Sequence, residues 1–130
     1  MPHFTFDYSA NLDGVVDMRA LARLIHETMM QTGLFELGAI RVRGFRTEAY
    51  AIADLLAENA FIDMSLRIGK GRSDADKKRA GEAIFGAVST FLSERFETPH
   101  FMLSLEIREI DADLSWKKNA IHPRLRQKTS

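Results

Sequence analysis

The chain repeats one order of sequence patterns, and that order restricts the folds open to it. Short segments in which every second residue is apolar, as in a β-strand, alternate with longer segments in which apolar residues recur at helical spacing. The strand-like segments are residues 2–8, 40–45, 62–68 and 101–107. The helix-like segments are residues 18–29 and 80–92. Each half therefore reads strand, helix, strand, and we predict two βαβ units offset by about 60 residues.

Two βαβ units combine into an α+β fold, with a four-stranded sheet that carries both helices on one face. We predict a single domain over residues 1–130, with pseudo-repeats at about 1–46 and 60–110 and a C-terminal tail over 111–130. The segment from Thr47 to Asn59 suits either a helix or a short strand and connects the repeats. The other face of the sheet is partly apolar and needs a cover, so we expect a symmetric homo-oligomer.

The tail has an unusual charge distribution. After Asp113 it contains no acidic residue and carries several lysines and arginines. A basic run of this kind is typical of a solvated tail. Trp116 and Ile121 interrupt the run and indicate that part of it packs, with a neighbouring copy as one place where it could do so.

Charge and composition exclude several classes of function. Lys and Arg together number 18, as do Asp and Glu, so the net charge is zero and gives no reason to expect binding to nucleic acid or to a membrane. Without cysteine the chain forms no disulfide and no thiolate metal site. It has no basic, apolar leader and no run of about 18 apolar residues, so we expect a cytoplasmic protein.

Known metal and nucleotide motifs are not matched. His26 and Glu27 begin a zinc-protease motif, but Met30 stands where the second histidine is required, so no metal site is expected. The glycine-containing turn at residues 69–73 fits neither a P-loop nor a dinucleotide-binding motif. Because this turn joins a strand end to a helix start, its free backbone N–H groups could still bind an anion, with Arg72 at the edge.

Pro2 is the residue whose position most directly suggests chemistry. When the initiator methionine is removed, the proline nitrogen becomes a secondary amine, which is a base, instead of an amide. In an apolar pocket beside arginines, burial and like charge would both lower the pKa of this amine toward neutrality, where a general base is most effective. The alternative interpretation is that a proline at this position only directs N-terminal processing.

Several longer segments resemble one family. They are residues 1–4 (MPHF), 38–43 (GAIRVR), 60–73 (AFIDMSLRIGKGRS), 104–107 (SLEI) and 116–119 (WKKN), followed by His122. With these segments the chain resembles the tautomerase superfamily over nearly its whole length. Within that superfamily it is most similar to the 5-carboxymethyl-2-hydroxymuconate Δ-isomerases.

The resemblance implies a tautomerase-like fold, a homotrimer and an active site near each amino terminus. It makes Pro2 the general base, which moves a proton within an unsaturated 2-hydroxy or 2-oxo polycarboxylic acid. The implied small-molecule substrate is 5-carboxymethyl-2-hydroxymuconate, from the catabolism of the aromatic compound homoprotocatechuate. Arg41 and Arg72 match the family's catalytic and substrate-binding arginines, one for a carboxylate and one for the oxygen that becomes negative. Neither a metal nor an organic cofactor is implied.

Two alternatives stay open at this point. The chain could be another proline-dependent tautomerase or a dehalogenase of the superfamily, which would share Pro2 but not necessarily both arginines. If Met1 is retained, the Pro2 nitrogen stays an amide, and the chain could be a non-catalytic trimeric module that binds a ligand. For Arg43, Arg46 and Arg67 we expect surface ion pairs and no part in catalysis.

Overall fold

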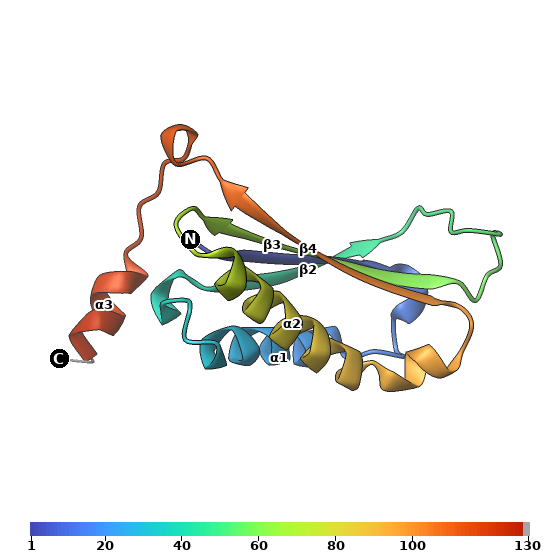
Figure 1. The fold of residues 1–130 in the computed structure, drawn as a ribbon. Helices are drawn as coiled ribbons and strands as arrows, with labels where there is room; N and C mark the ends of the chain where they lie inside the picture. Colours follow the sequence, from blue (N-terminus) through green and yellow to red (C-terminus); the bar gives the residue numbers. More distant parts are fainter. Residues whose placement is uncertain (129–130) are drawn as a thin grey trace.

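The computed structural model describes residues 1–128, so the last two residues of the predicted tail lie outside the described residues. Within this range four strands and three helices follow one another along the chain (Figure 1). The strands are β1 (His3–Ser9), β2 (Arg41–Thr47), β3 (Ala60–Gly69) and β4 (Phe101–Ile110). The helices are α1 (Met18–Gln31), α2 (Asp74–Phe91) and α3 (Ile121–Lys128). Short 3₁₀ turns are η1 (Ala10–Leu12), η2 (Leu37–Ala39), η3 (Ser93–Glu97) and η4 (Ala112–Leu114).

The strands form one mixed sheet in the order β2-β1-β3-β4. β1 is parallel to β2 and β3 is parallel to β4, because a helix returns the chain between the strands of each pair, whereas β1 and β3 are antiparallel. α1 and α2 cover one face of this sheet (Figure 1). The predicted α+β fold with two βαβ units and both helices on one face is confirmed.

Both covering helices begin at residues that satisfy free backbone N–H groups. Asp17 accepts a hydrogen bond from the Ala20 amide at 3.0 Å, and the Ser73 hydroxyl oxygen accepts one from the Asp76 amide at 3.1 Å. α1 ends shortly before Gly33, whose φ of +71° lies in the left-handed region that glycine adopts without strain. These local signals set where each helix starts and stops relative to the sheet.

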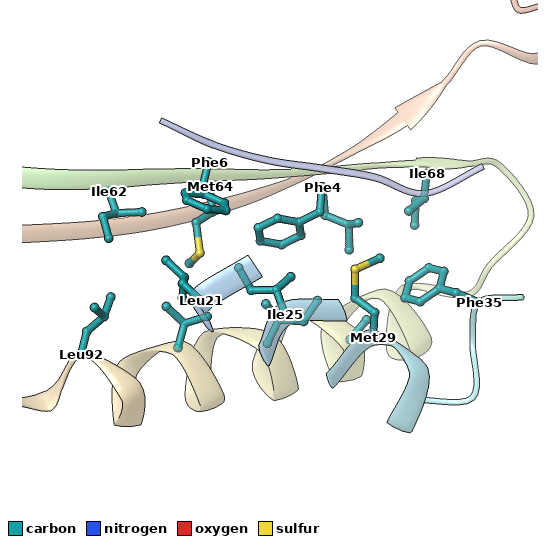
Figure 2. Close-up of a cluster of buried hydrophobic side chains, with 14 of the residues drawn as sticks. Phe4, Phe6, Leu21, Ile25, Met29, Phe35, Ile62, Met64, Ile68 and Leu92 are labelled. Carbon is teal, nitrogen blue, oxygen red and sulfur yellow. The ribbon is translucent and has the colours of Figure 1, made fainter. Parts of the chain in front are cut away.

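The core lies between the sheet and the two covering helices (Figure 2). The sheet contributes alternate residues of β1 and β3, and each helix contributes one stripe. Fully buried members of this layer are Phe4, Phe6, Ile62, Met64, Leu66, Ile68, Leu21, Ile25, Met29, Ile84 and Val88. Burial of a side chain of this size stabilises the fold by about 1.5–3 kcal/mol. β1 is therefore held as a central strand, and with it the amino terminus.

Phe6 also explains a glycine in β2. Phe6 and Gly44 are paired in register between β1 and β2. A Cβ at Gly44 would lie 2.5 Å from Cε2 and Cζ of the Phe6 ring, closer than real Cβ contacts. The ring is fully buried, so packed neighbours prevent it from moving away, and glycine is needed at position 44 to leave room for it.

The opposite face of the sheet carries no helix in the part of the chain that the structure describes. Its side chains are mostly polar or charged, and one row across the four strands consists of Arg41, His3, Arg67 and Arg108. Phe45 and Met102 are exposed to 48% and 51% on other strand positions. This face is therefore less apolar than expected. The alternation of side chains along the strands directs most of their large apolar residues toward the helices.

Residues 48–59 connect the two βαβ units without forming a helix or a strand. This loop projects beyond the sheet and is drawn in green in Figure 1. Ala53 and Leu55 have φ values of +49° and +67°, which belong to neither regular structure. The role of connector is confirmed, and both the helix and the strand considered for this segment are wrong.

Candidate active site

The amino terminus lies at the start of central strand β1, between parts of the chain that are distant in sequence. Pro2 is buried and Met1 is partly buried. A Cβ added to Gly69, at the end of β3, would lie 3.7 Å from the Met1 nitrogen. A cavity of about 200 Å³ beside Met1 is bounded by Gly69 and Lys70, where the turn between β3 and α2 begins, and by the segment after β4. Met1 therefore lines a small cavity that three segments of the chain form.

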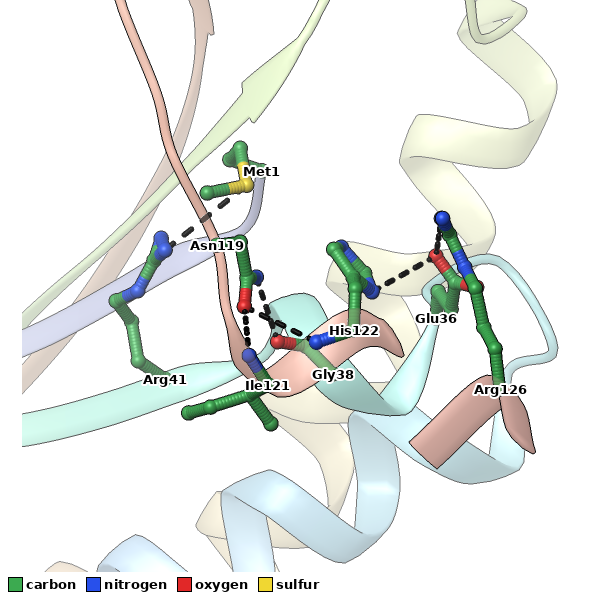
Figure 3. A network of polar contacts seen from close by, with 8 residues as sticks. All are labelled: Met1, Glu36, Gly38, Arg41, Asn119, Ile121, His122 and Arg126. Carbon is green, nitrogen blue, oxygen red and sulfur yellow. Dashed lines mark hydrogen bonds and ion pairs between the residues drawn. The ribbon is translucent and has the colours of Figure 1, made fainter. Parts of the chain in front are cut away.

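Arg41, the first residue of β2, approaches the amino terminus from one side. Its register partner in β1 is His3, and its Nη1 lies 3.0 Å from His3 Nε2. Its Nη2 lies 3.9 Å from the Met1 sulfur (Figure 3). Since arginine only donates, His3 has to accept at Nε2, which requires a neutral ring. Burial and then Arg41, Arg67 and Arg43 lower the His3 pKa to about 4, consistent with this neutral form.

Arg72, in the turn between β3 and α2, is held by the loop after α1. Its Nε and Nη2 donate to the Leu34 carbonyl oxygen at 3.3 and 3.0 Å, and its Nη1 donates to the Gly69 carbonyl oxygen at 3.4 Å. The guanidinium carbon lies 5.0 Å from the centre of the Phe35 ring, a cation–π distance. Arg72 is thus oriented by neutral groups, and no ion pair found among the described residues joins it to a carboxylate.

The electrostatics of the site follow from these placements. The pKa of the Met1 amine is lowered below its usual value, first by burial and then by the positive charges of Lys117, Arg72 and Arg41. The structure therefore brings both sequence-predicted arginines close to the amino terminus. With a lowered pKa, the amine is neutral at a pH where an exposed amine is already protonated. It can therefore act as a base at that pH.

Lys117 is the residue of this group that the sequence reasoning missed. It lies in the basic tail, for which a solvated state is typical, and no local periodicity marks it. The resemblance segment 116–119 contains it and was the one signal that could have indicated it. In the structure it borders the cavity next to Met1.

The tail reaches this position because it folds back over the loop before β2 (Figure 3). Asn119 donates from Nδ2 to the Gly38 carbonyl oxygen at 2.9 Å. Its Oδ1 accepts from the Ile121 and His122 amides at 2.8 and 3.1 Å and so starts α3. A Cβ at Gly38 would lie 2.7 Å from His122 Nδ1, so glycine permits the close approach of α3.

An ion pair holds the other end of α3. Arg126 donates from Nε and Nη2 to the two carboxylate oxygens of Glu36 at 2.6 and 2.7 Å, and His122 Nδ1 lies 3.1 Å from Glu36 (Figure 3). The hydrogen bond from Arg126 lowers the pKa of the Glu36 carboxyl. Part of the tail packs, as expected, but Trp116 and Ile121 are 85% and 50% exposed in this chain and do not account for that packing. Polar contacts anchor the tail instead.

Residues 1–128 carry neither a cluster of metal ligands nor a membrane-spanning helix. Among residues 1–128 no group of three or more His, Cys, Asp or Glu side chains is arranged to hold a metal ion. No helix in that range is long and apolar enough to cross a membrane. Arg46 forms surface ion pairs with Asp13 and Glu48, as expected, at 2.6 and 2.7 Å.

Two βαβ units on one sheet, with a partly buried amino terminus at the start of a central strand and cations around it, define an enzyme of the tautomerase superfamily. The chain belongs to the 5-carboxymethyl-2-hydroxymuconate isomerase family, whose profile matches residues 2–125. The family resemblance seen in the sequence is thereby confirmed.

Individual relatives are similar over almost the whole chain. A 5-carboxymethyl-2-hydroxymuconate Delta-isomerase from Escherichia coli is 34% identical over 122 residues, which cover 94% of this chain and 97% of that protein. A crystal structure of a 5-carboxymethyl-2-hydroxymuconate isomerase from Deinococcus radiodurans R1 has a TM-score of 0.90 at 35% identity, covering 95% and 93% of the two chains. Another 5-carboxymethyl-2-hydroxymuconate delta-isomerase structure has a TM-score of 0.88 at 29% identity, covering 96% and 93%.

Proposed function

We propose that this enzyme moves a proton within an unsaturated 2-hydroxy or 2-oxo polycarboxylic acid, and that its substrate is 5-carboxymethyl-2-hydroxymuconate from homoprotocatechuate catabolism. The observation that carries the proposal is the position of the amino terminus, where Pro2 is buried and Arg41, Arg72 and Lys117 lie close to Met1. Burial and then Lys117, Arg72 and Arg41 lower the pKa of the amine at this place. Relatives from Escherichia coli and Deinococcus radiodurans R1 are named as isomerases of this compound. A cationic site beside a weakly basic amine suits an acid of high negative charge.

We assign the base to Pro2, freed by removal of Met1. Pro2 is buried, whereas Met1 is only partly so. Its nitrogen is one residue further along the chain, at the more buried of the two positions. Burial and the three cations would then act on a secondary amine and lower its pKa for the same reasons.

The reaction conserves protons, so one base is sufficient. The neutral Pro2 nitrogen takes the proton of the 2-hydroxyl group, and the substrate becomes a dienolate. The protonated nitrogen then gives this proton to a carbon at the far end of the conjugated system, which leaves a 2-oxo product and a neutral amine. No water or cofactor enters this balance.

Arg41 and Arg72 are assigned to a substrate carboxylate and to the 2-oxygen, where negative charge develops. Arg72 is oriented in advance by the Leu34 carbonyl and the Phe35 ring. Arg41 contacts only the neutral His3 ring and the Met1 thioether among the polar contacts of the described residues. Neither guanidinium has to leave a carboxylate of the protein before it binds one of the substrate.

We also propose that the protein is a homotrimer. The helix-free face of the sheet exposes Phe45 and Met102, and an apolar groove of about 710 Å³ between α2 and β4 includes Phe85, Leu105 and Ile107. A ring of three copies, as the family resemblance implies, could bury both surfaces. Sedimentation equilibrium should give three times the chain mass of 14.7 kDa, and a monomer would contradict the proposal.

The catalytic proposal is tested with protein whose mass spectrum proves the loss of Met1. Ketonisation of 5-carboxymethyl-2-hydroxymuconate and of phenylpyruvate enol is followed by ultraviolet absorbance, and the first should be the better substrate. Pro2→Ala leaves a primary amine in place and should lower kcat by roughly a hundredfold or more, with an unchanged circular dichroism spectrum. Protein that retains Met1 serves as a control and should also be inactive.

Each outcome of this assay has a distinct meaning. Full turnover by Pro2→Ala contradicts the proline mechanism. Turnover of phenylpyruvate enol alone indicates another tautomerase of the superfamily. Turnover of neither compound by the mature protein indicates a module that binds a ligand without converting it.

A further inference from the structure

The cavity beside the amino terminus carries two lysines to which the reaction above assigns no contact with the substrate. Residues lining this cavity of about 200 Å³ include Met1, Gly69, Lys70, Ile110, Ser115 and Lys117. Lys70 belongs to the turn between β3 and α2, two residues before Arg72. Lys117 belongs to the segment after β4. Two distant parts of the chain therefore each bring a cation to one small cavity.

Neither lysine is neutralised by the protein. The residues that line the cavity include no carboxylate, and no ion pair found among the described residues involves Lys70 or Lys117. By contrast, Lys77 is paired with both Asp74 and Glu109, at 3.0 and 3.5 Å. Positive charges that line a concave surface without counter-charges favour the binding of an anion.

Lys117 is carried by an anchored backbone. Asn119, two residues further on, donates to the Gly38 carbonyl oxygen at 2.9 Å, and α3 is held by the Arg126–Glu36 ion pair at 2.6 Å. An anchored segment loses less conformational entropy when its side chain engages a ligand. Lys118, the next residue, is equally charged and exposed but does not line the cavity.

We propose that Lys70 and Lys117, the outer lysine pair, bind the carboxylate of a tricarboxylic substrate that Arg41 and Arg72 leave unpaired. The proposal rests on the proposed function, which places the reacting atoms at Pro2 and two anionic groups at the arginines. A third carboxylate then lies farther from Pro2, where this cavity can contain it. Ammonium groups impose no fixed plane on a carboxylate and suit a flexible carboxymethyl arm. The outer lysine pair thus selects tricarboxylates over smaller acids.

The test compares mature wild type with Lys70→Met and Lys117→Met, and with Lys118→Met as the control that removes the same charge. Binding of propane-1,2,3-tricarboxylate and of glutarate is measured by isothermal titration calorimetry, which needs no turnover. Each variant of the outer lysine pair should weaken tricarboxylate binding roughly five- to tenfold and glutarate binding less than about twofold. Lys118→Met should change neither.

Three results would overturn the outer lysine pair. They are equal weakening of both acids, an equal effect of Lys118→Met, and no binding of the tricarboxylate to wild type. Kinetics then separate this proposal from the proposed function. Lysine-dependent binding without turnover of 5-carboxymethyl-2-hydroxymuconate leaves the outer pair standing and refutes the function. Turnover of 5-carboxymethyl-2-hydroxymuconate with an unchanged KM in both lysine variants supports the proposed function and refutes the outer lysine pair.

Discussion

Asn119 donates a hydrogen bond to the carbonyl oxygen of Gly38 at 2.9 Å, across 81 residues of sequence, and joins the tail to the loop before β2. Arg41 begins β2 just after this loop, and Lys117 lies two residues before Asn119. One contact therefore ties together the segments that carry two of the cations around the amino terminus. The predictions below test this arrangement and the fold that supports it.

Gly38→Ala should loosen the tail. The new Cβ would meet His122 at 2.7 Å from Nδ1 and 3.1 Å from Cα, so α3 would have to shift. We expect a loss of about 1–3 kcal/mol in the free energy of unfolding and faster proteolytic cleavage after Asn119. Gly86→Ala, where a Cβ in α2 meets nothing within 4 Å, is the control and should stabilise the protein by about 0.5–1 kcal/mol. Equal protease resistance of Gly38→Ala and wild type would contradict the anchoring role.

Gly44→Ala should destabilise the core without touching the site. A Cβ there would lie 2.5 Å from two atoms of the buried Phe6 ring. We expect a loss of about 1–3 kcal/mol by urea denaturation. The double variant Gly44→Ala with Phe6→Leu lacks the ring. Its loss in the free energy of unfolding should therefore be smaller than the sum of the losses in the two single variants. Simple additivity would show that the ring is not what requires the glycine.

His3 predicts a pH dependence of stability. Burial, then Arg41, Arg67 and Arg43, lower its pKa from 6.5 to about 4. Between these values the unfolded chain binds a proton that the folded chain does not, so the free energy of unfolding should fall as the pH drops through this window. His3→Gln should flatten this part of the curve in urea titrations, whereas His26→Gln keeps His3 and should retain the slope. A His3→Gln curve parallel to wild type would be evidence against the assignment.

The pH profile of catalysis follows from the cations around the amine. Since burial and then Lys117, Arg72 and Arg41 lower the amine pKa, kcat/KM should rise with pH at values below those expected for an exposed amine. Lys117→Met removes one positive charge, which raises the amine pKa and should shift the rise to higher pH. Lys118→Met should not shift it. A shift to lower pH in Lys117→Met would contradict the electrostatic argument.

Arg72→Ala should impair the tricarboxylic muconate more than phenylpyruvate enol, by roughly tenfold or more in kcat/KM. Because Arg72 also holds the Leu34 carbonyl, the melting temperature is recorded to separate binding from folding. Arg46→Ala, which removes only exposed pairs with Asp13 and Glu48, should leave kcat/KM unchanged. An equal loss on both substrates would place Arg72 at a group that both share, the 1-carboxylate or the 2-oxygen, and would contradict contact with a carboxylate that only the muconate carries.

Strands and helices were predictable because their signals are local. Alternation at Phe4 and Phe6, and helical spacing at Ile84 and Val88, depend on periods of a few residues. They can be recognised without knowing how the other segments of the chain are arranged in space. The roles of Pro2, Arg41 and Arg72 came from the family resemblance and stay predictions, as do the domain bounds and the cytoplasmic location. The loop at 48–59 was ambiguous since helical composition competed with alternation, and neither accounts for the positive φ of Leu55.

By itself, the sequence determined which residues face the core, the order of the four strands and of the two helices that cover the sheet, and the family. It did not indicate α3 (Ile121–Lys128), which lies in the segment predicted as a tail. Only the tertiary structure decided that the basic tail returns to the amino terminus and brings Lys117 beside Met1. The contacts responsible, Asn119 to Gly38 and Arg126 to Glu36, join residues 81 and 90 positions apart. Polar contacts at such separations leave no periodicity in either segment, because they depend on the path of the whole chain between them.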